Sequence, residues 1–512
     1  MRSPFLARAA RRTPPAVGGP APALPAPQPL QNTALLTLAS LAAKGCGFVL
    51  LLVALNTLDT SEFGDYNAAL AFVALFAVVT DLGLSTLAVR DVAQDHAQLP
   101  RYVGNLLALR LVLSLVTIVV CIVLAATFNV LQGDATVRLG VVVWALGMTP
   151  IAIVGTVGVV FQSLERMATL SALTTITAAL TSLLGCAVLL FGGTAIPLLV
   201  TATVVNVVMA GVALVLAARV TSLRPRMDLS WWPSLVRSAL PFAVLTLLNV
   251  LYSRADMVLV IRLKNSHDAG LYSVAYRLVD TLLVVAISPF NAAALPAFNR
   301  IAARSADDLR RLVLSGLRIT LVIGVPVAVA ATAYAPTILT LVARRSDYLA
   351  AVPALRWLAW SFPCFTVLAI LYNAIYAAHR AGAMAVIFGL TLVFNVALNL
   401  LLIPRYGYFA SAALTTASEA LNVALAGWVV ARHVVNPLAV WPAVAKTAVA
   451  AAAMGVVLWL LGRLGPVAGL VVGLPVGGIV YLAAVRALRI FDAPERAILS
   501  RLPLAGRYAR WL

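Results

Sequence analysis

Ionisable side chains inside long apolar segments are the residues of this sequence that could do chemistry. Seven basic and four acidic residues fall within such segments: Lys44, Arg110, Arg254, Arg277, Arg318, Arg356, Lys446, Asp81, Asp256, Asp280 and Glu419. A charged side chain is costly in hydrocarbon, so such residues pair with one another, line an aqueous cavity or bind a ligand. Because the basic residues outnumber the acidic ones by three, pairing alone cannot neutralise them. The excess favours an anionic ligand.

Lys44, Arg254 and Arg277 lie deeper in their segments, and together with Arg110 they are the candidate ligand-binding residues. The other three lie within about two turns of a segment end, where long side chains reach the interface, and are expected to be structural. An arginine fork matches phosphate oxygens, and dry surroundings strengthen the attraction. A diphosphate is therefore the anion that a cavity lined by these side chains would bind.

A structural interpretation of the same charges stays open beside this one. At about 1.5 Å per residue along a helix, Lys44 and Asp81 lie at similar depth from one side of the membrane. Arg254, Arg277 and Asp280 lie at similar depth from the other side. Lys44 with Asp81, and either arginine with Asp280, would then form structural ion pairs.

The four acids, Asp81, Asp256, Asp280 and Glu419, are candidates either for binding a coupling ion or for ion pairing. The four cysteines all lie in apolar segments and the four histidines are scattered singly near loops, so neither type indicates a metal site. Glycine-rich phosphate loops and nucleophile elbows are also missing from the sequence. We therefore expect no enzymatic activity, no metal and no cofactor.

The elements that must position these charges are apolar helices. Hydrophobic residues make up 62% of the 512-residue chain and charged residues 11%, whereas soluble domains are about a quarter charged. Apolar runs of 18 or more residues indicate membrane-spanning helices, and the sequence holds fourteen of them: 34–57, 66–89, 104–127, 138–161, 168–191, 195–218, 239–261, 271–298, 312–335, 353–377, 383–403, 409–431, 442–462 and 466–486. The fold class is an all-α polytopic membrane protein.

A weak internal repeat divides the first twelve helices into two blocks of six. The stretch "SEFGDYNAAL" at 61–70 recurs as "HDAGLYSVAY" at 267–276, with an offset of 206 residues. Both copies stand between the first and second helix of a block, and an even number of helices gives the blocks the same orientation, as in transporters built of parallel repeats. Under this offset Lys44 aligns one turn before Arg254, so both cations are expected to face a cavity between two lobes.

The distribution of the basic residues predicts the topology. Outside the spans and the two tails, 13 Lys and Arg lie on the side of the termini and 7 on the opposite side, so both termini are expected in the cytoplasm. The net charge of +19 is then mostly a topology signal and not a nucleic-acid footprint. The expected parts are a disordered tail, an N-lobe, a C-lobe, a helix pair and a basic tail: 1–31, 32–220, 221–435, 436–490 and 491–512.

Nine stretches, in order, carry a resemblance to a known family: "EFGDYNAALAF", "TDLGLSTLAVRD", "FQSLERM", "LPFAVLTLLNVLYSRADMVLV", "DAGLYSVAYRLVDTLL", "ALPAF", "YLAAVPALRWLAW", "NAIYAAHR" and "NLLLIPRYGYFASAALTT". Over about residues 35–430 the chain resembles the oligosaccharide-lipid (polysaccharide biosynthesis) flippases of the multidrug/oligosaccharidyl-lipid/polysaccharide exporter superfamily. The resemblance implies two six-helix lobes, with two further helices in many members.

The resemblance also implies the function. Family members move polyprenyl-diphosphate-linked sugars across the cytoplasmic membrane by alternating access, through a cavity lined by basic residues, where Lys44 and Arg254 are expected to stand. The expected partners are this lipid-linked sugar, membrane lipids and the polymerase and glycosyltransferases of the pathway. A peptidoglycan-precursor (lipid II) flippase and a cation-coupled multidrug exporter of the same superfamily remain alternatives. A polysaccharide polymerase or ligase would need a large external loop, which the short breaks do not provide.

Overall fold

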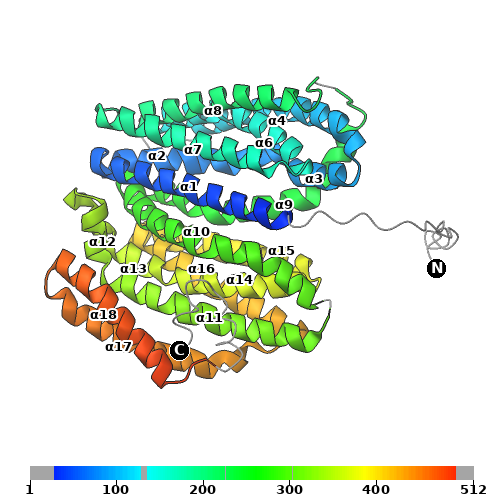
Figure 1. Ribbon diagram of the computed structural model, residues 1–512. Coiled ribbons are helices and arrows are strands. Elements are labelled where there is room, and N and C mark those ends of the chain that lie inside the picture. Colours follow the sequence, from blue (N-terminus) through cyan, green and yellow to red (C-terminus); the bar gives the residue numbers. More distant parts are fainter. Residues whose placement is uncertain (1–27, 128–134, 225–226, 303, 492–512) are drawn as a thin grey trace.

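The structure is a computed structural model that describes residues 28–127, 135–224, 227–302 and 304–491 (Figure 1). Every regular element within these ranges is a helix. The helices of the first half are α1 Gln28–Thr57, α2 Thr60–Asp81, α3 Leu84–Gln94, α4 Leu99–Thr127, α5 Ala135–Leu146, α6 Met148–Ser163, α7 Met167–Leu190 and α8 Ala195–Ala218. Those of the second half are α9 Trp232–Leu263, α10 Ser266–Ala302, α11 Ala306–Ala333, α12 Ala335–Val342, α13 Val352–Ala359, α14 Ser361–Ala377, α15 Ala381–Tyr406, α16 Tyr408–His433, α17 Trp441–Gly462 and α18 Pro466–Ala487. Three short 3₁₀ turns join them: η2 His96–Gln98, η3 Ser346–Ala351 and η4 Pro437–Val440.

The predicted spans are confirmed as helices. Within the described residues, 13 helical stretches are long and apolar enough to cross a membrane, and each overlaps one predicted span. The remaining prediction, 271–298, falls in the 37-residue helix α10. Three of these stretches are divided into two α-helices each, α2–α3, α5–α6 and α13–α14. At the first break Leu82 and Gly83 both have positive φ, and a Cβ on Gly83 would lie 2.6 Å from the Phe242 Cβ of α9.

The helices form two groups with a further pair attached. In Figure 1 helices α1–α8 lie together in the upper part of the molecule and α10–α16 in the lower part, with α17 packed beside α11 and α18 packed against α17. We refer to α1–α8 as the N-terminal group and to α9–α16 as the C-terminal group. The predicted boundaries near 220 and 435 fall in the connections that precede α9 and α17. The predicted tails lie almost entirely outside the described residues.

The two groups meet tightly where α1 turns into α2 and α9 into α10. Gly64 and Gly270, which the repeat pairs, stand at this contact: a Cβ on Gly64 would collide with the Ser266 carbonyl, and one on Gly270 with the Thr60 carbonyl. Each glycine therefore lets one group's backbone approach the other's, and the arrangement is reciprocal, as a pseudo-two-fold relation between the groups requires.

Polar contacts reinforce this end of the molecule. The Asn56 amide donates to the Val342 carbonyl at 3.0 Å and accepts from the Arg344 N–H at 2.9 Å. The Tyr348 hydroxyl donates to the Asp59 carbonyl at 3.2 Å, and its ring packs edge-on against Phe63. The residues around this contact also form one buried apolar cluster shared by both groups. The molecule is thus closed at the end where the two groups meet.

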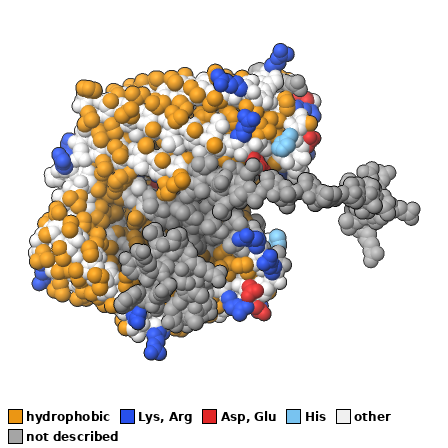
Figure 2. Space-filling model, viewed as in Figure 1, with side chains coloured by type: hydrophobic (Ala, Val, Ile, Leu, Met, Phe, Trp, Pro, Cys, Tyr) orange, Lys and Arg blue, Asp and Glu red, His pale blue; other side chains and the backbone are white. Residues whose placement is uncertain are grey.

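The outer surface is suited to lipid. Figure 2 shows apolar side chains spread over the flanks of the helices, while most of the visible Lys and Arg side chains lie towards the edges of the molecule. Large apolar side chains such as Leu183, Val393 and Ile479 are about two-thirds exposed, as expected for a bundle whose solvent at this level is hydrocarbon.

A cationic cavity between the two groups

A cavity of about 320 Å³ lies between the two helix groups and gathers three of the four predicted ligand-binding residues. Lys44 reaches it from α1, Arg254 from α9 and Arg277 from α10, and among the described residues that line it Asp280 of α10 is the only acid. Helices α2 and α5 complete the wall, so both groups contribute. The prediction that Lys44 and Arg254 face a shared cavity agrees with this arrangement.

Lys44 is paired with Asp280. The distance from Lys44 Nζ to Asp280 Oδ2 is 3.6 Å, and both side chains are nearly half exposed. The predicted pairing of Lys44 with Asp81 is wrong, as is the pairing of Asp280 with either arginine.

The helix lengths explain the correction. Lys44 stands 13 residues before the end of α1, and Asp280 stands 14 residues after the start of α10, at the same end of the molecule. At 1.5 Å per residue both lie about 20 Å from that end, whereas Asp81, at the far end of α2, lies about 30 Å away. The predicted depth of Asp81 was counted from the end of its apolar run. That run continues beyond Asp81, whereas helix α2 ends there, so the difference in depth was missed.

Arg277 and Arg254 differ in how they are held. Arg277 Nε donates to Asn67 Oδ1 at 2.6 Å, and its guanidinium carbon lies 5.9 Å from the centre of the Tyr66 ring, so it bridges α10 to α2. Arg254 is exposed to the cavity and forms no ion pair with any described residue. With three cations and one carboxylate in its wall, the cavity carries an excess of positive charge.

The sequence interpretation missed Tyr66 and Asn67, although a signal for them was present. The repeat aligns Tyr66 with Tyr272 and Asn67 with Ser273. Asn67, Tyr272 and Ser273 all line the cavity. These positions lie inside the repeated stretches 61–70 and 267–276, whose polar residues were not used in predicting the site.

The fourth predicted cation, Arg110, lies elsewhere. It is 2% exposed in α4, inside the N-terminal group, and is absent from the cavity lining. Its guanidinium forms an ion pair with Asp81 and donates to Ser85 Oγ at 2.6 Å and Thr156 Oγ1 at 3.1 Å. These contacts favour a structural role for Arg110 and Asp81, which join α4 to α2, α3 and α6.

A second cavity lies in the C-terminal group

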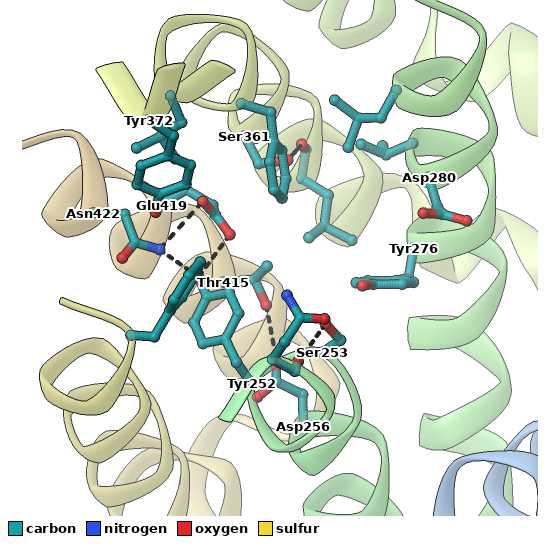
Figure 3. Close-up of a pocket in the computed structure, with 17 residues that line it drawn as sticks. Tyr252, Ser253, Asp256, Tyr276, Asp280, Ser361, Tyr372, Thr415, Glu419 and Asn422 are labelled. Atoms are coloured by element: carbon teal, nitrogen blue, oxygen red, sulfur yellow. Dashed lines mark hydrogen bonds between the residues drawn. The ribbon is translucent and has the colours of Figure 1, made fainter. Parts of the chain in front are cut away.

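A second cavity, of about 520 Å³, opens within the C-terminal group and holds the two remaining predicted acids, Asp256 and Glu419 (Figure 3). Its walls come from α9, α10, α13, α14, α15 and α16. Ser253, Tyr276 and Asp280 line both cavities. The two spaces are therefore adjacent.

Asp256 is held by neutral donors. Its carboxylate accepts hydrogen bonds from Thr415 Oγ1 at 2.9 Å, the Tyr272 hydroxyl at 3.1 Å and Asn399 Nδ2 at 3.2 Å. The Asn399 amide is held in turn by Asn395, four residues earlier on the same face of α15. This i, i+4 pair of asparagines inside an apolar run was visible in "FNVALNL" and was not used in predicting the site.

Glu419 has the same kind of environment. It accepts from the Tyr252 hydroxyl at 2.6 Å and from the Asn422 amide at 3.5 Å, and Figure 3 shows Tyr252 and Asn422 beside it. Neither Asp256 nor Glu419 forms an ion pair with a described residue. Of the two predicted roles, ion pairing is therefore not seen for these two acids among the described residues, and binding of a coupling ion stays a prediction.

A bundle of membrane-spanning helices in two groups, with a charged cavity between them, defines the class of polytopic membrane transporters. The particular family follows from the sequence: residues 30–302, more than half of the chain, match the model of the family described as polysaccharide biosynthesis protein. The chain belongs to that family. Residues 241–401 also match the MatE family.

Solved structures give the same fold. A lipid II flippase, MurJ, in an inward-closed conformation matches 89% of this chain and 98% of its own, with 12% identity and a TM-score of 0.75. An inward-facing multidrug resistance transporter of the MATE family matches 79% and 97%, with 15% identity and a TM-score of 0.59. The MATE transporter VcmN of Vibrio cholerae matches 79% and 95%, with 15% identity and a TM-score of 0.51. A search of curated proteins gives no match.

These findings confirm the resemblance noted in the sequence and the all-α polytopic fold. The chain is a multi-pass membrane protein with the fold of the superfamily that unites flippases and multidrug exporters.

Proposed function

We propose that the protein is a flippase that moves a polyprenyl-diphosphate-linked oligosaccharide across the cytoplasmic membrane. The single observation that carries this proposal is the excess of positive charge in the cavity between the two helix groups, where Lys44, Arg254 and Arg277 converge. Family membership supports it, because the matched family serves polysaccharide biosynthesis. These three cations would repel a cationic drug, which argues against a multidrug exporter of cationic drugs.

In the proposed mechanism the diphosphate enters the cavity and displaces Asp280 from Lys44. A diphosphate carries more charge than one carboxylate, and in low-dielectric surroundings its attraction for the ammonium is stronger. Arg254, which forms no ion pair with a described residue, contributes a second contact without breaking an ion pair. Arg277 contributes a third while Asn67 keeps its guanidinium in place. The polyprenol tail stays in the bilayer.

Release on the other side requires the closed end to open. The reciprocal contact of Gly64 and Gly270, with the Asn56 and Tyr348 hydrogen bonds, is the barrier that must separate. With the termini in the cytoplasm, as the distribution of Lys and Arg favours, this closed end faces outward. Outward movement of an anion is helped by the inside-negative potential, by roughly 2.3 kcal/mol per charge per 100 mV.

Asp256 and Glu419 offer a second source of driving force. A carboxylate that is buried among neutral donors gains from a bound proton or metal cation, and such groups mark ion pathways in membranes. In the proposed cycle an ion bound there biases the equilibrium between the two arrangements of the helix groups. Glycosyltransferases would supply the substrate and a polymerase would consume it.

The test is a flipping assay with purified protein in liposomes, using a fluorescent polyprenyl-diphosphate oligosaccharide. Lys44→Ala and Arg254→Ala should each abolish flipping, whereas the control Arg463→Ala, whose side chain stacks on Trp459 next to the end of α17, should flip at the wild-type rate. If the double variant of Lys44 and Arg254 still transports, the proposed role of the cavity is wrong. Lysis on depletion of the protein in cells would instead indicate a peptidoglycan precursor as substrate.

A further inference from the structure

In the proposed mechanism the diphosphate does not occupy the cavity in the C-terminal group. That cavity adjoins the cationic cavity through Ser253, Tyr276 and Asp280, so a ligand anchored by its diphosphate in the cationic cavity can extend into the other. We propose that this cavity is the binding site for the first sugar residues of the oligosaccharide. The inference rests on the proposed function and adds to it a site that recognises the glycan.

The wall has the composition that a sugar ring requires. Five aromatic side chains line it: Tyr252, Tyr276, Phe365, Tyr372 and Phe388. The C–H face of a pyranose packs on the electron-rich face of an aromatic ring, while its hydroxyls need donors and acceptors around the rim. Figure 3 shows Tyr252, Tyr276 and Tyr372 around the space, with Glu419 and Asn422 between two of the tyrosines.

Two polar side chains of the wall form no hydrogen bond with any residue that the structure describes. The Tyr372 hydroxyl oxygen is buried and forms no hydrogen bond with any described residue, although its ring is packed on Phe388 with centroids 5.6 Å apart. The side-chain amide of Asn249 is exposed in the cavity wall and likewise has no hydrogen-bond partner among the described residues. A buried hydroxyl without a partner is costly, and a ligand hydroxyl would relieve that cost.

Glu419 adds acceptor capacity. An ionised carboxylate offers about four lone-pair sites, of which Tyr252 and Asn422 occupy two. Hydrogen bonds from a sugar hydroxyl to a carboxylate are the stronger, charge-assisted kind. Glu419 can therefore receive a sugar hydroxyl while the Tyr252 contact keeps the carboxylate in place.

The size of the cavity argues for a glycan over a bare ion as its main occupant. About 520 Å³ falls within the range of sites for small organic ligands. Among the described residues, no group of three or more His, Cys, Asp or Glu side chains is arranged to hold a metal ion. A coupling ion would bind beside one carboxylate. Such an ion would not account for the aromatic side chains that line the cavity.

The test compares two ligands of wild-type protein in lipid nanodiscs: undecaprenyl diphosphate, and the lipid-linked oligosaccharide that accumulates in cells depleted of the protein. Wild type should bind the glycosylated lipid about tenfold more tightly. Tyr372→Phe and Asn249→Ala should each remove about one hydrogen bond and lose up to about tenfold in affinity for the glycosylated lipid only. Asn249 is exposed and Tyr372→Phe removes a single oxygen, so both variants should fold.

Tyr406→Phe is the matched control, because Tyr406 is 61% exposed and lines neither cavity. Its affinities for both lipids should equal those of wild type. Equal binding of the two lipids by wild type, or full retention of the glycan preference in both variants, would overturn the sugar site while leaving the diphosphate site intact. If wild type binds neither lipid, the proposed function itself fails.

Discussion

The two helix groups are related by a repeat, yet they treat their buried charges in opposite ways. In the N-terminal group Asp81 is paired with Arg110, and the pair is further fixed by Ser85 and Thr156. In the C-terminal group the hydrogen bonds that Asp256 and Glu419 accept from described residues come from hydroxyls and amides. Asp81 and Arg110 satisfy each other, whereas Asp256 and Glu419 form no ion pair with a described residue and remain available to a ligand or an ion. The difference assigns stability to the Asp81–Arg110 pair and exchange to the two carboxylates of the C-terminal group.

Arg110→Met should have the largest effect on stability. It leaves Asp81 without its cation, and breaking one side of a largely buried pair costs about 3 kcal/mol. We expect a clearly lower melting temperature in detergent. Glu419→Gln is the counterpart in the C-terminal group: Tyr252 and Asn422 are neutral, so their hydrogen bonds can re-form with an amide, and the melting temperature should change little.

The double variant Arg110→Met with Asp81→Leu sharpens this comparison. Replacing both members of a buried pair by apolar residues often restores stability, so its melting temperature should return towards that of wild type. If Arg110→Met melts like wild type but does not flip substrate, Arg110 belongs to the transport site after all, and the distinction between the groups fails.

Gly64→Ala examines the place where the two groups are most alike. The added methyl would meet the Ser266 carbonyl of the other group, and such overpacking costs about 1–3 kcal/mol. Because the strain exists only while this end is closed, the variant should shift the population towards the open arrangement. Labelling of a cysteine introduced at Asn67 by a reagent from the side of the closed end should accelerate.

Gly211→Ala serves as the control for that experiment, since a Cβ on Gly211 in α8 meets nothing within 4 Å. Unchanged labelling in Gly64→Ala would show that the contact is not a barrier between the groups.

The smallest effect on the melting temperature is expected from a change in the linker between the groups, which is the segment that joins α8 to α9. Asp228 receives hydrogen bonds from Ser230 and Arg101, which hold the pKa of its carboxyl below the usual 3.8. A lowered pKa means that the contact stabilises the fold at neutral pH and that this contribution is lost as the pH falls through the folded-state pKa. Asp228→Asn should lower the melting temperature slightly at pH 7.

The difference in melting temperature between Asp228→Asn and wild type should narrow as the pH falls from 3.8 through the lower pKa of the folded state, where the wild-type carboxyl also becomes neutral. A difference that stays constant below the folded-state pKa would mean that the charge of Asp228 does not fix the linker to the N-terminal group.

The spans and the repeat could be predicted from the sequence because both rest on local signals. An apolar run long enough to cross a membrane has few other outcomes, and the matched glycines at Gly64 and Gly270 reflect a contact that only glycine allows. The convergence of Lys44 and Arg254 also followed, since the offset of 206 residues gives the same face of equivalent helices.

The pairing of the charges could not be predicted, because it depends on where each helix ends and which helices touch. The sequence gives no sign that α4 passes beside Asp81, so Arg110 was placed in the wrong environment. The C-terminal network of Asn395, Asn399 and Thr415 was missed for a related reason. In the sequence, a single amide residue only interrupts an apolar run. Its role can be inferred only when its hydrogen-bond partners on other helices are known.

The central claim is that the cavity between the groups holds a diphosphate through Lys44, Arg254 and Arg277. It is tested most directly by the affinity of the purified protein for undecaprenyl diphosphate, measured for wild type and for Lys44→Gln with Arg254→Gln. Loss of two charge-assisted contacts should weaken binding by about a hundredfold or more, while Arg463→Gln should bind as wild type does. Wild-type affinity in the double variant would contradict the claim.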